Sequence, residues 1–470
     1  MLKRYLIKGG RDMSILTLKN IRCEMDGKLL FEADGLTIEE GDVIGLIGKN
    51  GAGKTCLLKI LAGELSDYAG YISGNRLTYF SELCITEDMT QSGGELSISS
   101  FLNALRQSVP LYLLDEPTTY LDQHHLKKVV RTIRRSPSSF CIASHDRAFL
   151  DAVATKIWLL EQGKITEYNG SFSDYVLARS MQLSQYEQEL KQYQKEKKKI
   201  KQSLRMMKEK QDQQDQKKGK PKKMSTSEYR IAGIKTKYGV KQKKLQKRIT
   251  RQQKKLEQLK QPYQVEDKYD ISFLSQLHCL PKRKIIIPSH EAKIGQKSLW
   301  HTPTIHLNSG DKLGIIGRNG AGKTTYLNYL ISVLPSTYKI CYFRQNHFQY
   351  LDPKMTVYEA IVEATNGYLS EHHIRTLLAL LDFKRDKVFR LIGDLSRGEH
   401  VKVSLLSLLV SESDILILDE MTNFLDIKAI EAVEKVLATY SGILIFVSHD
   451  QYFVQRLATS ILDIDTYKIM

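Results

Sequence analysis

Residues 317–324, which read GRNGAGKT, limit the possible folds of this chain more than any other stretch. They follow the apolar run 313–316 and precede a segment of helical composition, 325–330. A strand, a glycine-rich loop and a helix in this order form a phosphate-binding loop, because the glycines let backbone N–H groups point at phosphate oxygens. Lys323 is then predicted to reach the β- and γ-phosphates of a nucleotide, and Thr324 to hold Mg²⁺ through its hydroxyl.

A second copy of the motif, GKNGAGKT, occupies residues 48–55 and follows the apolar run 43–47. Two chance matches in matching contexts are not credible, so we predict two nucleotide-binding domains of parallel α/β type, with buried strands such as 442–447. The predicted nucleotide-binding residues of the two loops are Gly48, Asn50, Gly51, Gly53, Lys54, Thr55 and Cys56, and Gly317, Asn319, Gly320, Gly322, Lys323, Thr324 and Thr325.

The repeat extends beyond the loops. Asp115 and Asp419 each end an apolar run and lie 304 residues apart, and His145 and His449 are also 304 residues apart. The two phosphate-loop lysines are only 269 residues apart. The offset therefore changes by 35 residues between the lysines and the aspartates. Gln91 follows Glu82 by 9 residues, whereas Leu395 follows Gln345 by 50, so the first half lacks a segment of about 41 residues that the second half keeps. The apolar spacing in that segment, roughly 357–389, predicts helices.

The acidic pairs supply the other groups that ATP hydrolysis needs. Asp115 and Asp419 are the expected Mg²⁺ partners, and the glutamates that follow them, Glu116 and Glu420, are expected to orient or deprotonate the attacking water. A lone histidine is more often a core residue. The equal 30-residue spacing from each aspartate instead makes His145 and His449 candidate site residues.

These motifs together resemble an ATP-binding cassette protein. Each half has a Walker A loop, a signature (SGGE or SRGE), a Walker B strand with glutamate, a Leu-Asp D-loop and a Ser-His-Asp switch. The resemblance covers residues 13–180 and about 285–465. Two cassettes joined by a long charged linker, without a membrane domain, resemble the ABC-F subfamily. The short first cassette and the phrase TNFLDIKAIEAVE at 422–434 resemble its antibiotic-resistance members.

The resemblance implies that the two cassettes of one monomer pack head to tail around two ATP molecules, and that each histidine contacts a γ-phosphate. Site one would combine Lys54, Thr55, Asp115, Glu116 and His145 with Ser396, Gly398 and Glu399. Site two would combine Lys323, Thr324, Gln345, Asp419, Glu420 and His449 with Ser92, Gly93, Gly94 and Glu95. The Mg²⁺ ligands would be Thr55, Asp115, Thr324, Gln345 and Asp419.

Several residues depart from the family pattern and predict an asymmetric pair of sites with weaker base selectivity. Acidic Glu82 replaces an expected glutamine, and cationic Arg397 replaces a signature glycine. The other departures are Gln91 in the first signature, Met421 after the second Walker B motif, and Met25 and Ile294 where many relatives stack an aromatic ring on adenine.

Almost all of the net charge of +17 belongs to one segment. Residues 181–260 contain 26 of the 70 Lys and Arg residues but only 8 of the 53 Asp and Glu residues. Apolar residues recur there at heptad spacing on both sides of 211–236, which contains Gly219, Pro221 and Gly233, so we predict a basic helical hairpin of roughly 60 Å with its tip in that range. It is either a solvated coiled coil or an arm that grips RNA phosphates.

The residues that supply this charge are Lys195, Lys197, Lys198, Lys199, Lys201, Arg205, Lys241, Lys243, Lys244, Lys247, Arg248 and Arg251. The predicted domains are an optional extension (1–12), the first cassette (13–171), the linker (172–265) and the second cassette (266–470). Scattered cysteines fit a reducing cytosol, and no apolar run approaches the 18 residues of a membrane span.

The resemblance implies a cytoplasmic, ribosome-associated ATPase whose linker meets 23S rRNA and peptidyl-tRNA from the exit-tRNA site. Such a protein would dislodge peptidyl-transferase-centre antibiotics, with pleuromutilins, lincosamides and streptogramin A as the expected classes. Two alternatives stay open. One is a housekeeping translation or ribosome-assembly factor, and the other is the ATPase subunit of a drug exporter.

Overall fold

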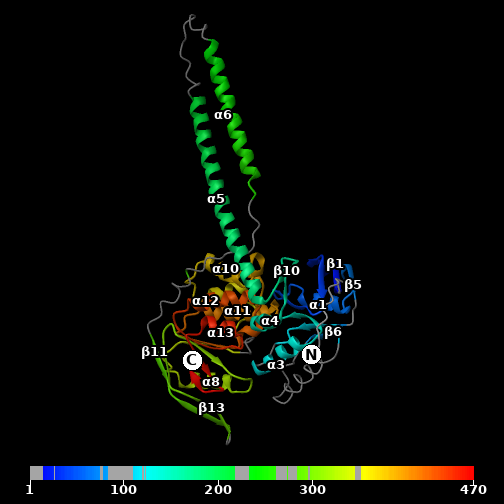
Figure 1. Cartoon of the computed structure of the whole chain (residues 1–470). Helices are drawn as coiled ribbons and strands as arrows, with labels where there is room; N and C mark the ends of the chain where they lie inside the picture. The colour runs from blue at the N-terminus through cyan, green and yellow to red at the C-terminus, as the bar shows by residue number, and fades with distance from the viewer. Residues whose placement is uncertain are drawn as a thin grey trace, which may run out of the picture. The chain divides into compact units, whose positions relative to one another are not determined.

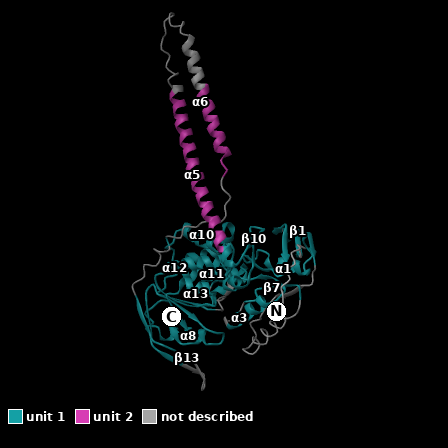
Figure 2. Ribbon diagram, in the orientation of Figure 1, with its two compact units in different colours: residues 1–175, 269–470 teal, residues 176–268 magenta. Residues whose placement is uncertain are grey.

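The computed structural model describes residues 14–25, 27–74, 78–82, 109–118, 121, 123–216, 232–260, 273, 283–294, 297–344 and 351–469. The chain divides into two compact units, residues 1–175 with 269–470 and residues 176–268 (Figure 2). The first unit carries both nucleotide-binding halves. Among the described helices, none is long and apolar enough to cross a bilayer.

A parallel sheet forms the centre of the first half. Its strands lie in the order β6 (Thr78–Glu82), β7 (Leu111–Asp115), β8 (Ser139–Ala143), β4 (Val43–Gly48) and β9 (Lys156–Glu161). Beyond β9 the sheet continues with β10 (Lys164–Asn169), β2 (Lys28–Ala33), β1 (Ser14–Met25), β3 (Leu36–Glu39) and β5 (Ala69–Gly74). These pairings are antiparallel except that of β10 with β2, which is parallel. The first phosphate loop follows the central strand β4.

The second half repeats this order. Its parallel strands are β16 (Ile340–Phe343), β17 (Ile415–Asp419), β18 (Ile443–Val447), β15 (Lys312–Ile316) and β19 (Ser460–Asp463), followed by β20 (Lys468–Ile469). Its other strands pair as β11 (Lys284–Ile287) with β14 (Ile305–Asn308) and β12 (His290–Ile294) with β13 (Lys297–Thr302). The predicted tandem α/β fold is confirmed, and the second phosphate loop follows β15 as the first follows β4.

Helices cover these sheets (Figure 1). The first half contributes α1 (Lys54–Ala62), α3 (Gln123–Arg135) and α4 (Arg147–Val153). The second contributes α8 (Lys323–Val333), α12 (Ile427–Ala438) and α13 (Gln451–Leu457). Helices predicted for 357–389 are confirmed as α9 (Val357–Ala364), α10 (Glu371–Leu380) and the 3₁₀ turn η2 (Arg385–Phe389). The turn η3 (Ile392–Asp394), α11 (Arg397–Val410) and the turn η4 (Met421–Phe424) complete the second half.

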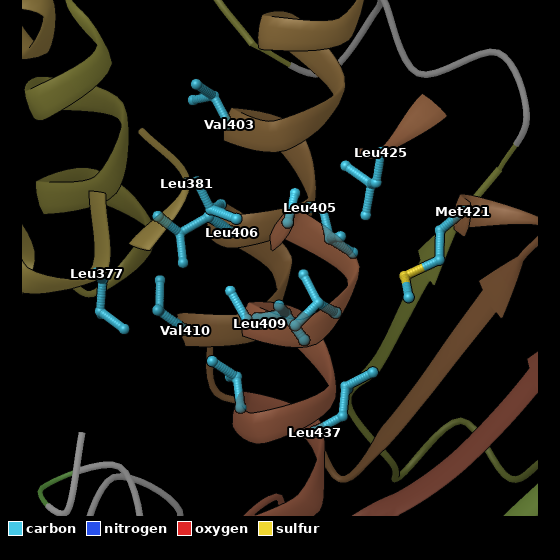
Figure 3. Packing of buried hydrophobic residues seen from close by; sticks show 14 of the residues in the cluster. Leu377, Leu381, Val403, Leu405, Leu406, Leu409, Val410, Met421, Leu425 and Leu437 are labelled. Carbon is cyan, nitrogen blue, oxygen red and sulfur yellow. The ribbon is translucent and has the colours of Figure 1, made fainter. Parts of the chain in front are cut away.

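One apolar core joins α10, α11, α12 and the turn after β17. Figure 3 shows Leu377 of α10 and Leu381, the C-cap of that helix, beside α11, whose Leu406, Leu409 and Val410 point into this core. Met421 and Leu425 are 1% and 0% exposed and belong to the same cluster. Met421, which departs from the family pattern, therefore fills core volume, and the turn it belongs to is packed on α11.

The second unit contains most of α5 (Phe172–Gln216) and α6 (Ala232–Gln258), which lie side by side (Figures 1 and 2). The predicted heptad residues Ile200 of α5 and Ile249 of α6 lie on the covered sides of their helices, since they are 7% and 3% exposed. The predicted hairpin is confirmed. Its helices extend further than expected, because α5 continues through residues 211–216, which contain neither glycine nor proline. Residues 217–231, with most of the predicted tip, lie outside the described residues.

Candidate functional site

The first phosphate loop runs from the end of β4 to the start of α1. Gly53 caps α1 with φ 104°, in the left-handed region that favours glycine. A Cβ there would lie 2.9 Å from Cδ1 of Phe31, so a side chain is excluded on steric grounds too. The Nζ of Lys54 donates to the backbone oxygens of Gly48 (2.9 Å) and Lys49 (3.2 Å), which curls the loop around the ammonium group. The loop thus has the curled backbone and central lysine that phosphate binding needs.

The second loop has the same construction. Gly322 caps α8 with φ 90°, and the Nζ of Lys323 donates to the backbone oxygens of Gly317 and Arg318, each at 3.0 Å. Arg318 itself pairs with Asp465 of its own half at 3.2 Å. The two predicted loops are therefore equivalent in local geometry and differ in what surrounds them.

A hydroxyl–carboxylate pair lies beside each loop. The Oγ1 of Thr55 donates to Oδ2 of Asp115 at 2.6 Å, and the Oγ1 of Thr324 donates to Oδ2 of Asp419 at 3.0 Å. Among the described residues, the buried Oδ1 of Asp419 has no hydrogen-bond partner, and burial raises the pKa of this carboxyl to about 6. A cation beside Asp419 would stabilise the charged carboxylate and so offset the cost of burying it. Oxygen donors of this kind fit Mg²⁺.

Both candidate catalytic glutamates have strained backbones. Glu116 and Glu420 have φ values of 48° and 50°, in the left-handed region that side chains with a Cβ rarely occupy. Such strain persists only where surrounding structure enforces it, and it is common at active sites. The Oε1 atoms lie 3.4 Å from Nε2 of His145 and 3.1 Å from Nε2 of His449, respectively. The structure thus brings each predicted glutamate to its predicted histidine.

His145 is in the middle of the first site. Its Nε2 lies 2.9 Å from Oδ1 of Asn50 and 3.2 Å from Nζ of Lys54. Burial, and next the charge of Lys54, lower the pKa of His145, so the ring is neutral at physiological pH. Burial also lowers the pKa of Lys54, against the attraction of nearby carboxylates. A neutral imidazole can accept or donate one proton in a hydrogen bond at this position.

The second half approaches the first loop with charged groups. Asp382, which follows α10, accepts from Nζ of Lys49 at 2.6 Å. Asp426, the N-cap of α12, accepts from the backbone N–H of Asn50 at 3.3 Å. Ser396 is the N-cap of α11 in a capping box with Glu399. Asp382 and Asp426 were not among the predicted site residues. Asp426 had a sequence signal, since it ends the second Leu-Asp D-loop.

The remaining predicted residues are placed as follows. Cys56 and Thr325 lie in the first turns of α1 and α8, and Gly398 lies in the first turn of α11. Arg397 is the exposed first residue of α11, and Met25 is 55% exposed. The residues that fall outside the description are Gln91, Ser92, Gly93, Gly94, Glu95 and Gln345, together with the side chains of Glu82 and Ile294. The role of the first-cassette signature in site two, and that of Gln345 as an Mg²⁺ ligand beside Thr324 and Asp419, therefore stay predictions.

Glu116 gives the nucleotide-free protein an unusual dependence on pH. Burial raises the pKa of Glu116 to about 7, so the folded protein binds this proton more tightly than the unfolded chain does. The free energy of unfolding is then expected to fall as pH rises from about 4.5 to about 7, opposite to the usual carboxylate case. Because the side chain is 32% exposed, we expect solvent to limit the change to about 1–2 kcal/mol.

Denaturant unfolding of wild type and Glu116→Gln without nucleotide or Mg²⁺, at pH 5, 6, 7 and 8, measures this change. The variant is expected to gain stability relative to wild type as pH rises. Parallel pH profiles for the two proteins would show that Glu116 titrates normally.

Comparison with known proteins finds relatives that align with most of this chain. The family profile described as ABC transporter matches residues 31–90 and 301–423. Ribosome protection protein VmlR of Bacillus subtilis is 30% identical over an alignment that covers 95% of this chain and 86% of that protein. Erythromycin resistance ATP-binding protein MsrA of Staphylococcus epidermidis is 29% identical, with 90% and 92% coverage.

Among solved structures, the archaeal ribosome recycling factor aABCE1, in complex with the ribosomal stalk protein aP1, superimposes with a TM-score of 0.60. The match covers 95% of this chain and 87% of that chain at 18% identity. This likeness concerns the fold, which in both proteins is a pair of tandem nucleotide-binding cassettes.

Proposed function

Because the chain belongs to the ABC-F family of ATP-binding cassette proteins, we propose that it is a ribosome-binding ATPase in which ATP controls binding. The observation that carries the proposal is the full-length similarity to a ribosome protection protein, 30% identical over 95% of this chain. The chain is an ATPase, since both halves carry the phosphate loop, the Thr–Asp pair and the Glu–His pair that hydrolysis needs.

Each group has a separate part in hydrolysis. Lys54 and Lys323 place a positive charge at the phosphates, and the two Thr–Asp pairs would hold Mg²⁺, which neutralises phosphate charge when bound. Glu116 and Glu420 orient the attacking water and accept its proton. The histidines fix these carboxylates and face the terminal phosphate.

Contacts between the halves make this chemistry a switch. Asp426 meets the N–H of Asn50 and Asp382 meets Lys49, so groups of the second half complete the first site. A nucleotide on the first loop favours the state in which the halves are together, and loss of its terminal phosphate releases that preference. We propose that the joined state is the one that binds ribosomes.

The linker is the proposed RNA-binding element. Ile200 and Ile249 occupy the covered sides of α5 and α6, whereas Lys198, Lys199 and Lys243 are exposed. This arrangement leaves the lysines available to rRNA phosphates and does not use them for helix packing. Contacts of this kind are sequence-independent and weaken steeply with salt.

Co-sedimentation with ribosomes tests the proposal. The Glu116→Gln, Glu420→Gln double variant is expected to hydrolyse ATP only slowly, and so to pellet with ribosomes when ATP is present and to stay in the supernatant without it. Exchange of Lys198, Lys199, Lys243 and Lys244 for glutamine in this variant is expected to weaken binding and flatten its salt dependence. Exchange of four linker glutamines for asparagine (Gln192, Gln194, Gln202 and Gln253) is a neutral control. Collection of the variant with membranes in ATP would favour the exporter alternative.

The finer proposal is that the protein protects ribosomes from antibiotics of the peptidyl-transferase centre. Its support is the name of one relative, a ribosome protection protein, and the family resemblance of residues 422–434. Expression in a sensitive host should raise the inhibitory concentration of a pleuromutilin, a lincosamide or a streptogramin A. A macrolide belongs in the panel, since another relative is named for erythromycin resistance. Unchanged susceptibility together with a growth defect on deletion would favour a housekeeping translation factor.

A further inference from the structure

Lys402 is a buried cation that belongs to none of the predicted motifs. It lies on α11 with 7% of its surface exposed, and its Nζ donates to Oδ2 of Asp426 at 2.9 Å. Asp426 is 3% exposed and uses its other oxygen, Oδ1, to accept from the backbone N–H of Ala429 at the start of α12. One ammonium group and one helix N-terminus therefore hold this carboxylate in a fixed orientation.

The same carboxylate reaches the other half. Its Oδ2 accepts from the backbone N–H of Asn50, and the side-chain Oδ1 of Asn50 lies 2.9 Å from Nε2 of His145. That ring nitrogen is 3.4 Å from Oε1 of Glu116. A continuous polar chain thus runs from Lys402 through Asp426, Asn50 and His145 to the glutamate of the first site.

Both ends of the Lys402–Asp426 pair are held by apolar packing. Residues of α11 on either side of Lys402, Val401 and Val403, are 2% and 0% exposed, and Leu425 beside Asp426 is fully buried in the same core (Figure 3). Burial raises the pKa of Asp426, but the ammonium of Lys402 and hydrogen bonds outweigh it and lower the pKa to about 2. The carboxylate of Asp426 is therefore ionised, and an uncharged residue at 402 would leave it buried without its counter-charge.

The sequence repeat has no second lysine of this kind. The offset of 304 residues that relates Ser92 to Ser396 and Asp115 to Asp419 relates Ile98 to Lys402. Asp122 is the counterpart of Asp426 by the same offset, so the first half keeps the D-loop carboxylate but replaces its buried cation by an apolar side chain. Ile98 and Asp122 lie outside the described residues, and the comparison rests on the sequence alone.

We propose that Lys402 is a positioning residue for ATP hydrolysis at the first site and has no counterpart at the second. It holds Asp426 against the N–H of Asn50, and Asn50 in turn places His145 and Glu116. The first site is then assembled correctly only when the second half is in contact with it, which makes hydrolysis there dependent on closure. The inference rests on the proposed ATPase function and adds a specific residue to one of its two sites.

Single-site backgrounds test the proposal. Glu420→Gln leaves hydrolysis to the first site, and Glu116→Gln leaves it to the second. Lys402→Met introduces a side chain of nearly the same length as lysine but without charge, and Lys402→Arg keeps the charge. In the Glu420→Gln background, Lys402→Met is expected to lower kcat at least about 10-fold while KM changes less than about 3-fold, because a small displacement of catalytic groups is enough for such a loss.

Lys402→Arg is expected to restore most of kcat, which a purely structural role would not require. In the Glu116→Gln background the effect of Lys402→Met should be less than about 2-fold. Asp426→Asn in the Glu420→Gln background should lower kcat to a similar extent, and the combination with Lys402→Met should be no worse than either change alone. Equal losses at both sites, failure of the arginine variant, or additive losses would overturn the proposal.

A readout without turnover separates this inference from the proposed function. In the Glu116→Gln, Glu420→Gln variant, ATP with Mg²⁺ should raise Tm, and Lys402→Met should reduce that rise while Lys402→Arg preserves it. The Tm values without ATP identify any variant that fails to fold. An unchanged ATP-induced rise in a folded Lys402→Met protein would count against the role of Lys402. Failure to bind ribosomes would count against the proposed function and leave the Lys402 result to stand.

Discussion

The Glu116→Gln, Glu420→Gln double variant is expected to hydrolyse ATP about 10²–10⁴-fold more slowly than wild type. Each glutamate follows the aspartate of its Thr–Asp pair, has a left-handed backbone and lies within 3.4 Å of a histidine nitrogen. Glutamine keeps the shape and the hydrogen-bonding reach of this side chain but cannot accept a proton from water. Phosphate release under saturating ATP and Mg²⁺ measures the loss.

The two single variants divide this loss between the sites. Each single variant should keep the part of the wild-type rate that comes from the site with its glutamate intact. Glu412→Gln is a suitable control, because Glu412 has 55% of its side chain exposed and pairs only with surface Lys339 among the described residues. The control should retain the wild-type rate. Hydrolysis within about 10-fold of wild type in the double variant would assign proton transfer to another group.

Arg147→Met is expected to lower the free energy of unfolding by about 3–5 kcal/mol. Arg147 begins α4 in the first half and is 1% exposed. Its guanidinium reaches two carboxylates of the second half, Oε1 of Glu434 at 2.5 Å and Oδ2 of Asp450 at 2.8 Å. Methionine fills similar volume but leaves buried Asp450 without its cation, while Glu434 keeps only its pair with Arg456 at 3.0 Å. Removal of one partner is the costly way to break a buried ion pair.

Denaturant unfolding of the full-length chain measures this effect, with Lys339→Met as the matched control. Lys339 and Glu412 form a surface pair at 3.3 Å with side chains 71% and 55% exposed, and the loss of such a pair costs less than about 1 kcal/mol. Exchange of Asp450 for asparagine together with Arg147→Met should recover part of the loss, because Asp450 is the carboxylate left without a cation and asparagine can still cap α13. Equal stability of the Arg147→Met and Lys339→Met proteins would mean that the ion pairs of Arg147 contribute little to the free energy of unfolding.

The sequence predicted the parts of the site that neighbouring residues build. The phosphate loops, the Thr–Asp pairs and the acidic strand ends could be recognised because a glycine-rich loop after a buried strand has one local geometry, whatever surrounds it. The repeat offset of 304 residues identified the histidines as candidate site residues, and heptad spacing predicted the covered sides of α5 and α6. The runs of Val, Ile and Leu predicted a parallel sheet but not the order of its strands.

The contacts between the halves came from the tertiary structure alone. Lys402, Asp426 and Asn50 meet although Asn50 and Asp426 are 376 residues apart, and Arg147 meets Glu434 across 287 residues. No spacing rule applies at such distances, since the partner of a buried charge is chosen by how two folded surfaces pack and by the cost of leaving that charge unpaired. The sequence determined each half and its chemistry, and packing of the halves decided which charges complete the first site.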